Sequence, residues 1–145
     1  MSDASEMRSM QLAGCATHPI RFVDGDAPVD FVLANDADVE SVAADLAGYR
    51  SIALVFPKWA DGRAYSQARL LRARYRFKGE IRATGEVLVD MMPLLARTGF
   101  DAVALRADQS KEFAERALSF FSDGHYQGDL VEPLPRFRRS GEAPA

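Results

Sequence analysis

The residues best suited to chemistry lie in one basic stretch, "FPKWADGRAYSQARLLRARYRFKGEIR", at residues 56–82. Residues 58–82 contain eight Lys and Arg side chains and two acidic ones, although the 145-residue chain has a net charge of −3. Lys and Arg side chains bind oxyanions, and Arg can hold a carboxylate or phosphate through two parallel hydrogen bonds. The stretch therefore indicates either an oxyanion site or a basic docking surface.

The loop at residues 57–63 is the first candidate for an oxyanion site. It lies between a predicted strand and a predicted helix, and ligands of parallel α/β sheets gather beyond the carboxyl ends of the strands. The first N–H groups of a helix are free, Gly62 lets the backbone approach a ligand, and Lys58 and Arg63 add full charges. Asp61 supports the competing interpretation, because as an N-cap it would occupy the same N–H groups in a purely structural turn.

The later strands bring further polar side chains toward this edge of the predicted sheet. The candidate anion-binding residues are therefore Lys58, Gly62, Arg63, Arg82 and Arg106. Glu86 and Asp108 follow the same two strands, and a carboxylate beside a cation could transfer a proton. The alternative for these side chains is an internal network of salt bridges that neutralises a polar face of the sheet.

The helix that follows the loop presents two kinds of surface. Ala64, Ala68, Leu71 and Tyr75 recur at helical spacing, which predicts the face that packs on the core. The outer flank and the preceding loop supply candidate partner-binding residues, namely Trp59, Tyr65, Arg69, Arg72 and Arg76. The alternative is an ordinary solvated surface on which the arginine stems cover apolar neighbours.

Several classes of protein are excluded by composition and spacing. One cysteine and two histidines make no metal-ligand pattern, so no metal site is predicted, and no cofactor is evident because neither a Walker sequence nor a GxGxxG sequence is present. No Ser-His-Asp or Cys-His set can be drawn, which leaves open whether the protein is an enzyme. The acidic net charge predicts no nucleic-acid partner, no apolar run is long enough to span a membrane, and the lone cysteine fits a cytoplasmic protein.

The remaining pattern predicts an α/β fold of four sequential βα units with a parallel sheet. The predicted strands cover residues 29–34, 51–56, 80–84 and 101–106, and the predicted helices lie within residues 35–48, 62–76, 86–99 and 109–124. Two layouts satisfy this order, an open doubly wound sheet and a half-barrel-like sheet.

Alternation within the third strand helps to choose between the two layouts. Ile81 and Ala83 point to one face of the strand, whereas Glu80, Arg82 and Thr84 point to the other. A doubly wound sheet has two apolar faces, so one apolar and one polar face favours the half-barrel-like layout.

The expected organisation is a flexible leader at residues 1–18, a single α/β domain at 19–131 and a flexible tail at 132–145. The first two strands are apolar on both faces, and four strands do not close a barrel, so some apolar surface has to be covered. A second copy is favoured, which predicts a homodimer. The other possibility is the chain's own termini, with Ile20, Phe22, Leu130, Leu134 and Phe137 as anchors.

A family resemblance rests on three segments, "DGRAYSQARLLRARY", "GEIRATGEVLVD" and "RTGFDAVALR". Together they resemble a small uncharacterised bacterial family whose genes often neighbour those for assimilatory sulfite reductase. The resemblance covers about residues 50–106, and members are often labelled as probable oxidoreductases of sulfite reduction. It implies a cytoplasmic role in sulfur assimilation and supplies no catalytic residues.

Two functions are expected from the residues and the resemblance together. The first is an accessory protein of assimilatory sulfite reduction that docks on a partner enzyme through its basic helix face. The second is a small oxyanion-binding module or enzyme whose site lies at the carboxyl ends of the strands.

Overall fold

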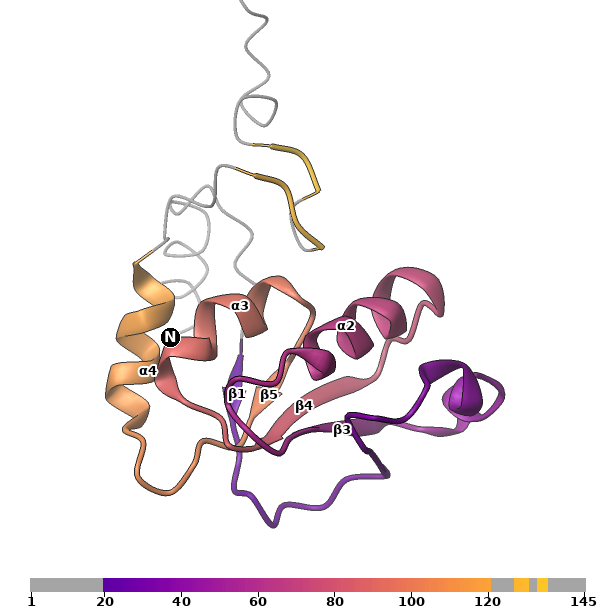
Figure 1. The fold of residues 1–145 in the computed structure, drawn as a ribbon, viewed down its shortest axis with the longest axis horizontal. Helices are drawn as coiled ribbons and strands as arrows, with labels where there is room; N and C mark the ends of the chain where they lie inside the picture. The colour runs from indigo at the N-terminus through magenta and orange to yellow at the C-terminus, as the bar shows by residue number, and fades with distance from the viewer. Residues whose placement is uncertain (1–19, 121–126, 131–132, 136–145) are drawn as a thin grey trace, which may run out of the picture.

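The computed structural model describes residues 20–120, 127–130 and 133–135 and shows one sheet with helices packed on it (Figure 1). The strands are β1 (Arg21–Phe22), β2 (Phe31–Leu33), β3 (Ser51–Phe56), β4 (Glu80–Gly85) and β5 (Ala102–Val103). The helical segments are η1 (Val39–Gly48), α2 (Arg63–Arg69), η2 (Leu70–Arg74), η3 (Val89–Met91), α3 (Met92–Arg97) and α4 (Lys111–Ser119). The predicted α/β class is confirmed.

The sheet is parallel throughout, with the strand order β1-β5-β4-β3-β2. Strands β2 to β5 are therefore neighbours in chain order, and α2, α3 and α4 lie on one side of the sheet (Figure 1). A doubly wound sheet would carry helices on both faces, so the arrangement follows the sequential alternative. The sequence did not predict β1, since its two residues are too short to show a strand pattern.

Several predicted elements differ in length or type. The strand predicted at residues 101–106 ends at Val103, because the Arg106 N–H then donates to the Val87 carbonyl in the turn after β4, at 3.0 Å. The first predicted helix is the 3₁₀ helix η1, and Asp38 caps it by accepting the Glu40 N–H at 3.0 Å.

The register of the strands builds the core on the side that faces the helices. Ile52 pairs with Ile81 and Leu54 pairs with Ala83, and all four side chains belong to one buried apolar cluster. The helices contribute small and large side chains to the same cluster, including Ala64, Ala68, Leu71, Met92, Leu95 and Ala114. The alternation predicted for the third strand, with Ile81 and Ala83 toward the helices, is confirmed.

Around β4, the opposite face of the sheet carries small and charged side chains. Ala53, Arg82, Ala102 and Ala104 are all buried on it. The chain between β1 and β2 runs beneath this face (Figure 1), and its Ala27 carbonyl accepts a hydrogen bond from Arg82 at 2.8 Å. The protein therefore covers part of its polar face with its own loop.

The long helix predicted for residues 62–76 changes type and then ends in a strained turn. α2 passes without a break into the π-helix η2. Arg76 then adopts the left-handed conformation, with φ of 55°, and the Phe77 N–H closes the end by donating to the Leu71 carbonyl at 2.8 Å. This hydrogen bond spans seven residues, one more than the Schellman cap, and the left-handed position inside it is one that glycine usually supplies at a helix C-terminus. Arg76 therefore ends the helix.

The predicted apolar anchors near the termini fall into three groups. Ile20, Phe22 and Leu130 are half-buried, and the first two pack against the core cluster. Leu134 is exposed. Phe137 lies outside the described residues, as do the whole of the predicted leader and most of the predicted tail.

Candidate functional site

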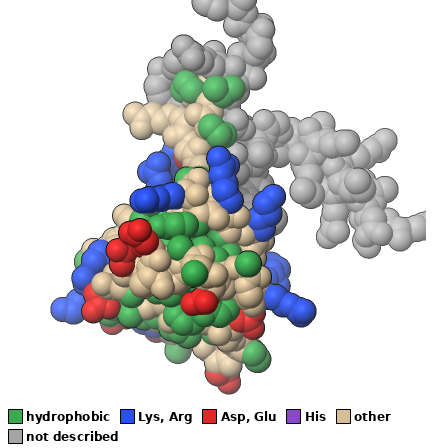
Figure 2. Space-filling model, turned by 90° about the vertical axis from the view of Figure 1, so that its right-hand side faces the viewer, with side chains coloured by type: hydrophobic (Ala, Val, Ile, Leu, Met, Phe, Trp, Pro, Cys, Tyr) green, Lys and Arg blue, Asp and Glu red, His purple; other side chains and the backbone are tan. Residues whose placement is uncertain are grey.

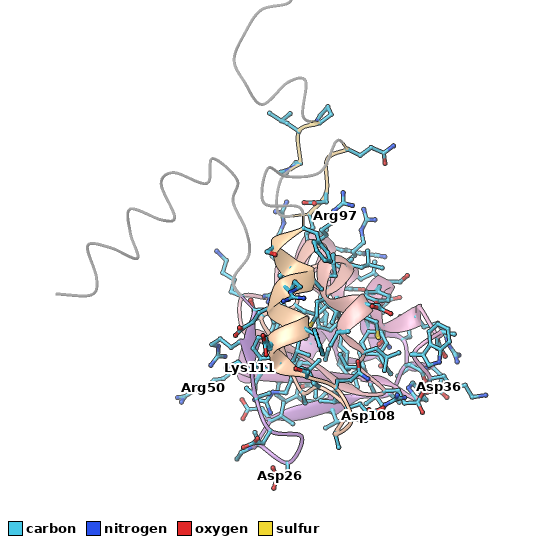
Figure 3. The ribbon with its side chains drawn as sticks, turned by 90° about the vertical axis from the view of Figure 1, so that its left-hand side faces the viewer. Asp26, Asp36, Arg50, Arg97, Asp108 and Lys111 are labelled. Atoms are coloured by element: carbon cyan, nitrogen blue, oxygen red, sulfur yellow. The ribbon has the colours of Figure 1, made fainter. Side chains whose placement is uncertain are left out.

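The carboxyl ends of the strands bring polar loops together at one edge of the sheet. Asn35 follows β2, Trp59 and Asp61 follow β3, and Glu86 follows β4. The Asn35 amide donates to Asp61 Oδ2 at 2.6 Å, and Glu86 Oε2 accepts the Trp59 N–H at 3.2 Å. Asp108, from the loop after β5, is labelled in Figure 3 with other acidic side chains of the loops. The structure therefore places the predicted loop at the edge where ligands of parallel sheets bind.

Asp61 controls the start of α2. Its Oδ1 accepts the backbone N–H of Arg63 at 3.1 Å, and its Oδ2 accepts Nη2 of the same guanidinium at 2.8 Å. The Arg63 side chain, followed by the Arg63 backbone N–H, lowers the pKa of Asp61 to about 2. The N-cap residue of α2 is Gly62, without a side-chain cap bond, so the interpretation of Asp61 as the N-cap is wrong by one residue. Asp61 still occupies the Arg63 N–H and guanidinium that an oxyanion would need, which is the arrangement of a structural turn.

Arg106 has a carboxylate partner of its own. Its Nε donates to Asp108 Oδ1 at 2.6 Å and its Nη2 donates to Oδ2 at 2.8 Å. The Arg106 side chain lowers the pKa of Asp108 to about 2. A general acid or base works best with a pKa near the operating pH, so neither Asp61 nor Asp108 is suited to proton transfer at neutral pH. The geometry favours the salt-bridge alternative for this edge.

Lys58 and Gly62 complete the predicted loop. Both residues are exposed, and the Lys58 carbonyl accepts the Asp61 N–H at 3.0 Å in the turn before α2. Within the described residues, the Lys58 ammonium makes no ion pair. Of the predicted cations at this edge, Arg63 and Arg106 are paired with carboxylates. Within the described chain, Lys58 is therefore the one that remains available to an oxyanion.

Arg82 does not belong to this edge. The pleat of β4 directs its side chain to the face away from the helices, where it is only 8% exposed and donates to Glu80 Oε2 at 2.8 Å. Its Nη1 donates to the Ala27 carbonyl at 2.8 Å, and its Nε is buried without a partner in the described part of the chain. Arg82 holds the loop that covers the sheet, and it lies away from the other predicted anion-binding residues.

Two predicted partner-binding residues face the interior. Arg72 donates from Nε to the Gly99 carbonyl at 3.0 Å and forms an ion pair with Asp101. Tyr65 is half-buried, and its ring packs edge-on against Phe56 with the centroids 5.1 Å apart. Burial raises the pKa of Tyr65 to about 12. Both side chains support the fold, because the helix rotates them toward the core rather than to the outer flank.

Four exposed cations lie instead between the end of α2 and the turn to β4. We call this cluster the basic end, and it consists of Arg69, Arg74, Arg76 and Lys78, all of which are exposed. None of the four makes an ion pair with another described residue. Lys and Arg side chains lie along the upper part of the surface in Figure 2, above hydrophobic side chains. Sequence reasoning identified Arg69 and Arg76 as docking residues and omitted Arg74 and Lys78.

Trp59 stands apart from the basic end. Its side chain is 58% exposed in the loop before α2. It precedes α2, whereas the members of the basic end begin at Arg69, the last residue of α2, and continue to Lys78 beyond η2. The predicted partner-binding set therefore divides into an exposed tryptophan at one end of the helix and a cationic cluster at the other.

Neither a metal centre nor a membrane span is found in the part of the chain that the structure describes. That part contains no group of three or more His, Cys, Asp or Glu side chains that could hold a metal ion. None of the described helices is both long enough and apolar enough to cross a membrane.

Comparison with known proteins identifies a family. The model of a family described as "Bacterial protein of unknown function (DUF934)" matches residues 30–137. No curated protein matches the chain, and no solved structure does either. The match covers the sheet from β2 onward, the candidate edge and the basic end.

Proposed function

The chain belongs to the DUF934 family of bacterial proteins of unknown function, and we propose that it is a non-catalytic accessory protein of assimilatory sulfite reduction. In this proposal it docks on a partner enzyme through the basic end. The sulfur role follows from the resemblance of the three sequence segments quoted above, and the docking role follows from the charge arrangement.

One observation carries the docking proposal. At the strand edge, Arg63 and Arg106 are neutralised by Asp61 and Asp108, at 2.8 Å and 2.6 Å. At the basic end, four exposed cations have no carboxylate partner within the described chain. Unpaired cations on a protein of negative net charge attract an acidic surface, because complementary charges steer encounter and orient the partner.

Binding of this kind has a physical signature. Exposed charges are screened within about 8 Å at physiological ionic strength. The association should therefore weaken as salt rises, and it should respond to reversal of the charges that contact the partner.

Co-purification tests the proposal. An affinity-tagged chain, expressed in a bacterium growing on sulfate as its sulfur source, should retain an enzyme of sulfite reduction at low salt. Arg69→Glu combined with Arg76→Glu should abolish that retention. Lys111→Glu is the matched control, since Lys111 is an exposed cation on α4 (Figure 3) outside the basic end.

Two results would reject the proposal. If the double variant retains the enzyme as well as the wild type does at moderate salt, the docking face is wrong. If the wild type retains no enzyme of sulfite reduction, the sulfur role is wrong.

The oxyanion-binding alternative rests on Lys58, the exposed cation without an ion pair in the described chain at the strand edge. Titration with sulfate, followed by backbone amide NMR, tests this site. Saturable shifts confined to residues 58–63 and lost in Lys58→Met would support an oxyanion site. A flat response would leave Asp61 as part of a structural turn.

A further inference from the structure

A groove lies between η1 and the turn that follows η2. One wall is formed by Ala43, Leu46 and Ala47 of η1, and the groove has a volume of about 410 Å³. The other residues that line it are Tyr49, Tyr75, Arg76, Phe77, Lys78 and Gly79. The hydrophobic side chains seen among the charged ones in Figure 2 belong to the side of the molecule that Figure 1 shows at its right, where η1 lies.

The walls of the groove are apolar and partly aromatic. Small side chains at Ala43 and Ala47 leave room above the buried Leu46. Tyr49 is fixed by stacking on Phe31, with the ring centroids 5.0 Å apart and the planes 16° apart. A surface of this kind favours an apolar side chain, because burial of apolar area is the main non-directional source of binding.

The rim of the groove is cationic. Arg76 and Lys78 are exposed, and no ion pair holds either of them within the residues that the structure describes. Arg76 also occupies a left-handed position, with φ of 55°, where glycine would be unstrained. Backbone strain of this kind is concentrated at ligand clamps and functional sites, which makes the Arg76 side chain a candidate for contact with a partner.

We infer that the groove receives one large apolar side chain, such as Phe or Leu, from an acidic segment of a partner protein. The carboxylates on either side of that side chain pair with Arg76 and Lys78. This inference rests on the proposed docking function, and it names the feature that the partner presents to the basic end. A protein segment fits better than a free small molecule, because Ala47, Arg76 and Lys78 are exposed and the site cannot enclose its occupant as small-molecule pockets do.

Peptides with a single difference test the inference on the full-length protein. The first probe is an acetylated peptide with one Phe between four acidic residues, and the second carries Ser in place of Phe. The Phe peptide should shift the backbone amide NMR signals of Ala43, Ala47 and Gly79. It should bind about tenfold or more tightly than the Ser peptide, since burial of a Phe side chain is worth at least that factor.

Variants of the chain separate the apolar contact from the charge contact. Ala47→Trp should fill the groove and weaken binding of the Phe peptide to the level of the Ser peptide. Thermal unfolding checks that this variant is folded. Lys78→Glu should weaken the binding of both peptides. Lys111→Glu, outside the groove, should change neither.

Three outcomes would overturn the inference. Equal binding of the two peptides would show that the basic end recognises charge alone. That result would leave the docking proposal intact. No binding of either peptide would reject the groove as a docking site, and the co-purification experiment would still judge the docking proposal separately. Saturation of the groove by free N-acetylphenylalanine as tightly as by the peptide would assign it to a small carboxylate instead.

Discussion

The guanidinium of Arg72 and the carboxylate of Asp101 form an ion pair between the end of the basic helix and the start of β5. Only 15% of the Arg72 side chain and 25% of the Asp101 side chain are exposed. The same carboxylate accepts the Ile81 N–H at 3.0 Å, and Arg72 Nη1 donates to the carbonyls of Phe77 and Gly79, both at 2.8 Å. Arg72 therefore joins three segments that meet at the amino ends of β4 and β5.

Arg72→Met should destabilise the protein by about 2–3 kcal/mol. The variant keeps the length of the side chain but removes the Arg72 donors from Asp101 and from the carbonyls of Phe77, Gly79 and Gly99. Partial exposure reduces the penalty expected for a fully buried pair. Urea unfolding followed by circular dichroism measures the change. Arg69→Met is the control and should stay within about 0.5 kcal/mol of the wild type. A similarly small loss for Arg72→Met would mean that the ion pair does not hold the segments together.

Arg76→Gly should raise the free energy of unfolding by about 0.5–1 kcal/mol. Glycine adopts the left-handed conformation of this helix end without steric strain, whereas Arg76 adopts it at a cost. Arg76→Ala removes the charge but keeps the strain, so it should not be stabilised. If Ala and Gly stabilise equally, relief of charge repulsion and not of backbone strain explains the gain. The glycine variant should at the same time lose affinity for an acidic partner.

Asp61 should make stability depend on pH at low pH. Its pKa falls from the ordinary value of 3.8 to about 2 in the folded protein, mainly because of Arg63. A lowered pKa in the folded state stabilises the protein above the unfolded-state pKa, and this contribution is lost as pH falls from about 4 toward 2. The urea midpoint of the wild type should therefore fall more steeply across this window than that of Asp61→Asn, whose amide oxygen can still accept the Arg63 N–H. Parallel curves for the two proteins would show that Asp61 is not paired in solution.

The sequence pattern predicts a homodimer, and the described structure leaves apolar surface on the sheet that a second copy could cover. Val32 on β2 is 55% exposed, and Val55 on β3 points to the same face and is half-buried. Light scattering at micromolar concentration should report twice the mass of the chain. Val32→Lys should shift the mass toward that of one chain. A monomer mass that persists after a roughly tenfold rise in concentration would exclude the dimer.

Sequence reasoning succeeded where the pattern is local. The β-α alternation predicted the parallel sheet, and Ile81 and Ala83 showed which face of β4 meets the helices. These features depend on residue spacing and on backbone chemistry that neighbouring residues supply.

The site was only partly predictable. The loop with Asp61 and Arg63 was placed at the correct edge, because the carboxyl ends of parallel strands meet there whatever the side chains are. Which cations are already neutralised was not visible, since the pairing of Arg72 with Asp101 joins positions 29 residues apart. Equally, a helical wheel could not show that Arg76 ends the helix in a left-handed turn.

The sequence by itself determined the class of the fold, the apolar face of the strands and the concentration of basic residues at positions 58–82, because all three follow from composition and periodicity along the chain. Only the tertiary structure decided the use of those basic residues. It directed Arg72 and Arg82 to internal partners and left Arg69, Arg74, Arg76 and Lys78 exposed. The physical reason is that a cation pairs with a carboxylate that lies close to it in space, and the packing of the strands and helices sets that distance.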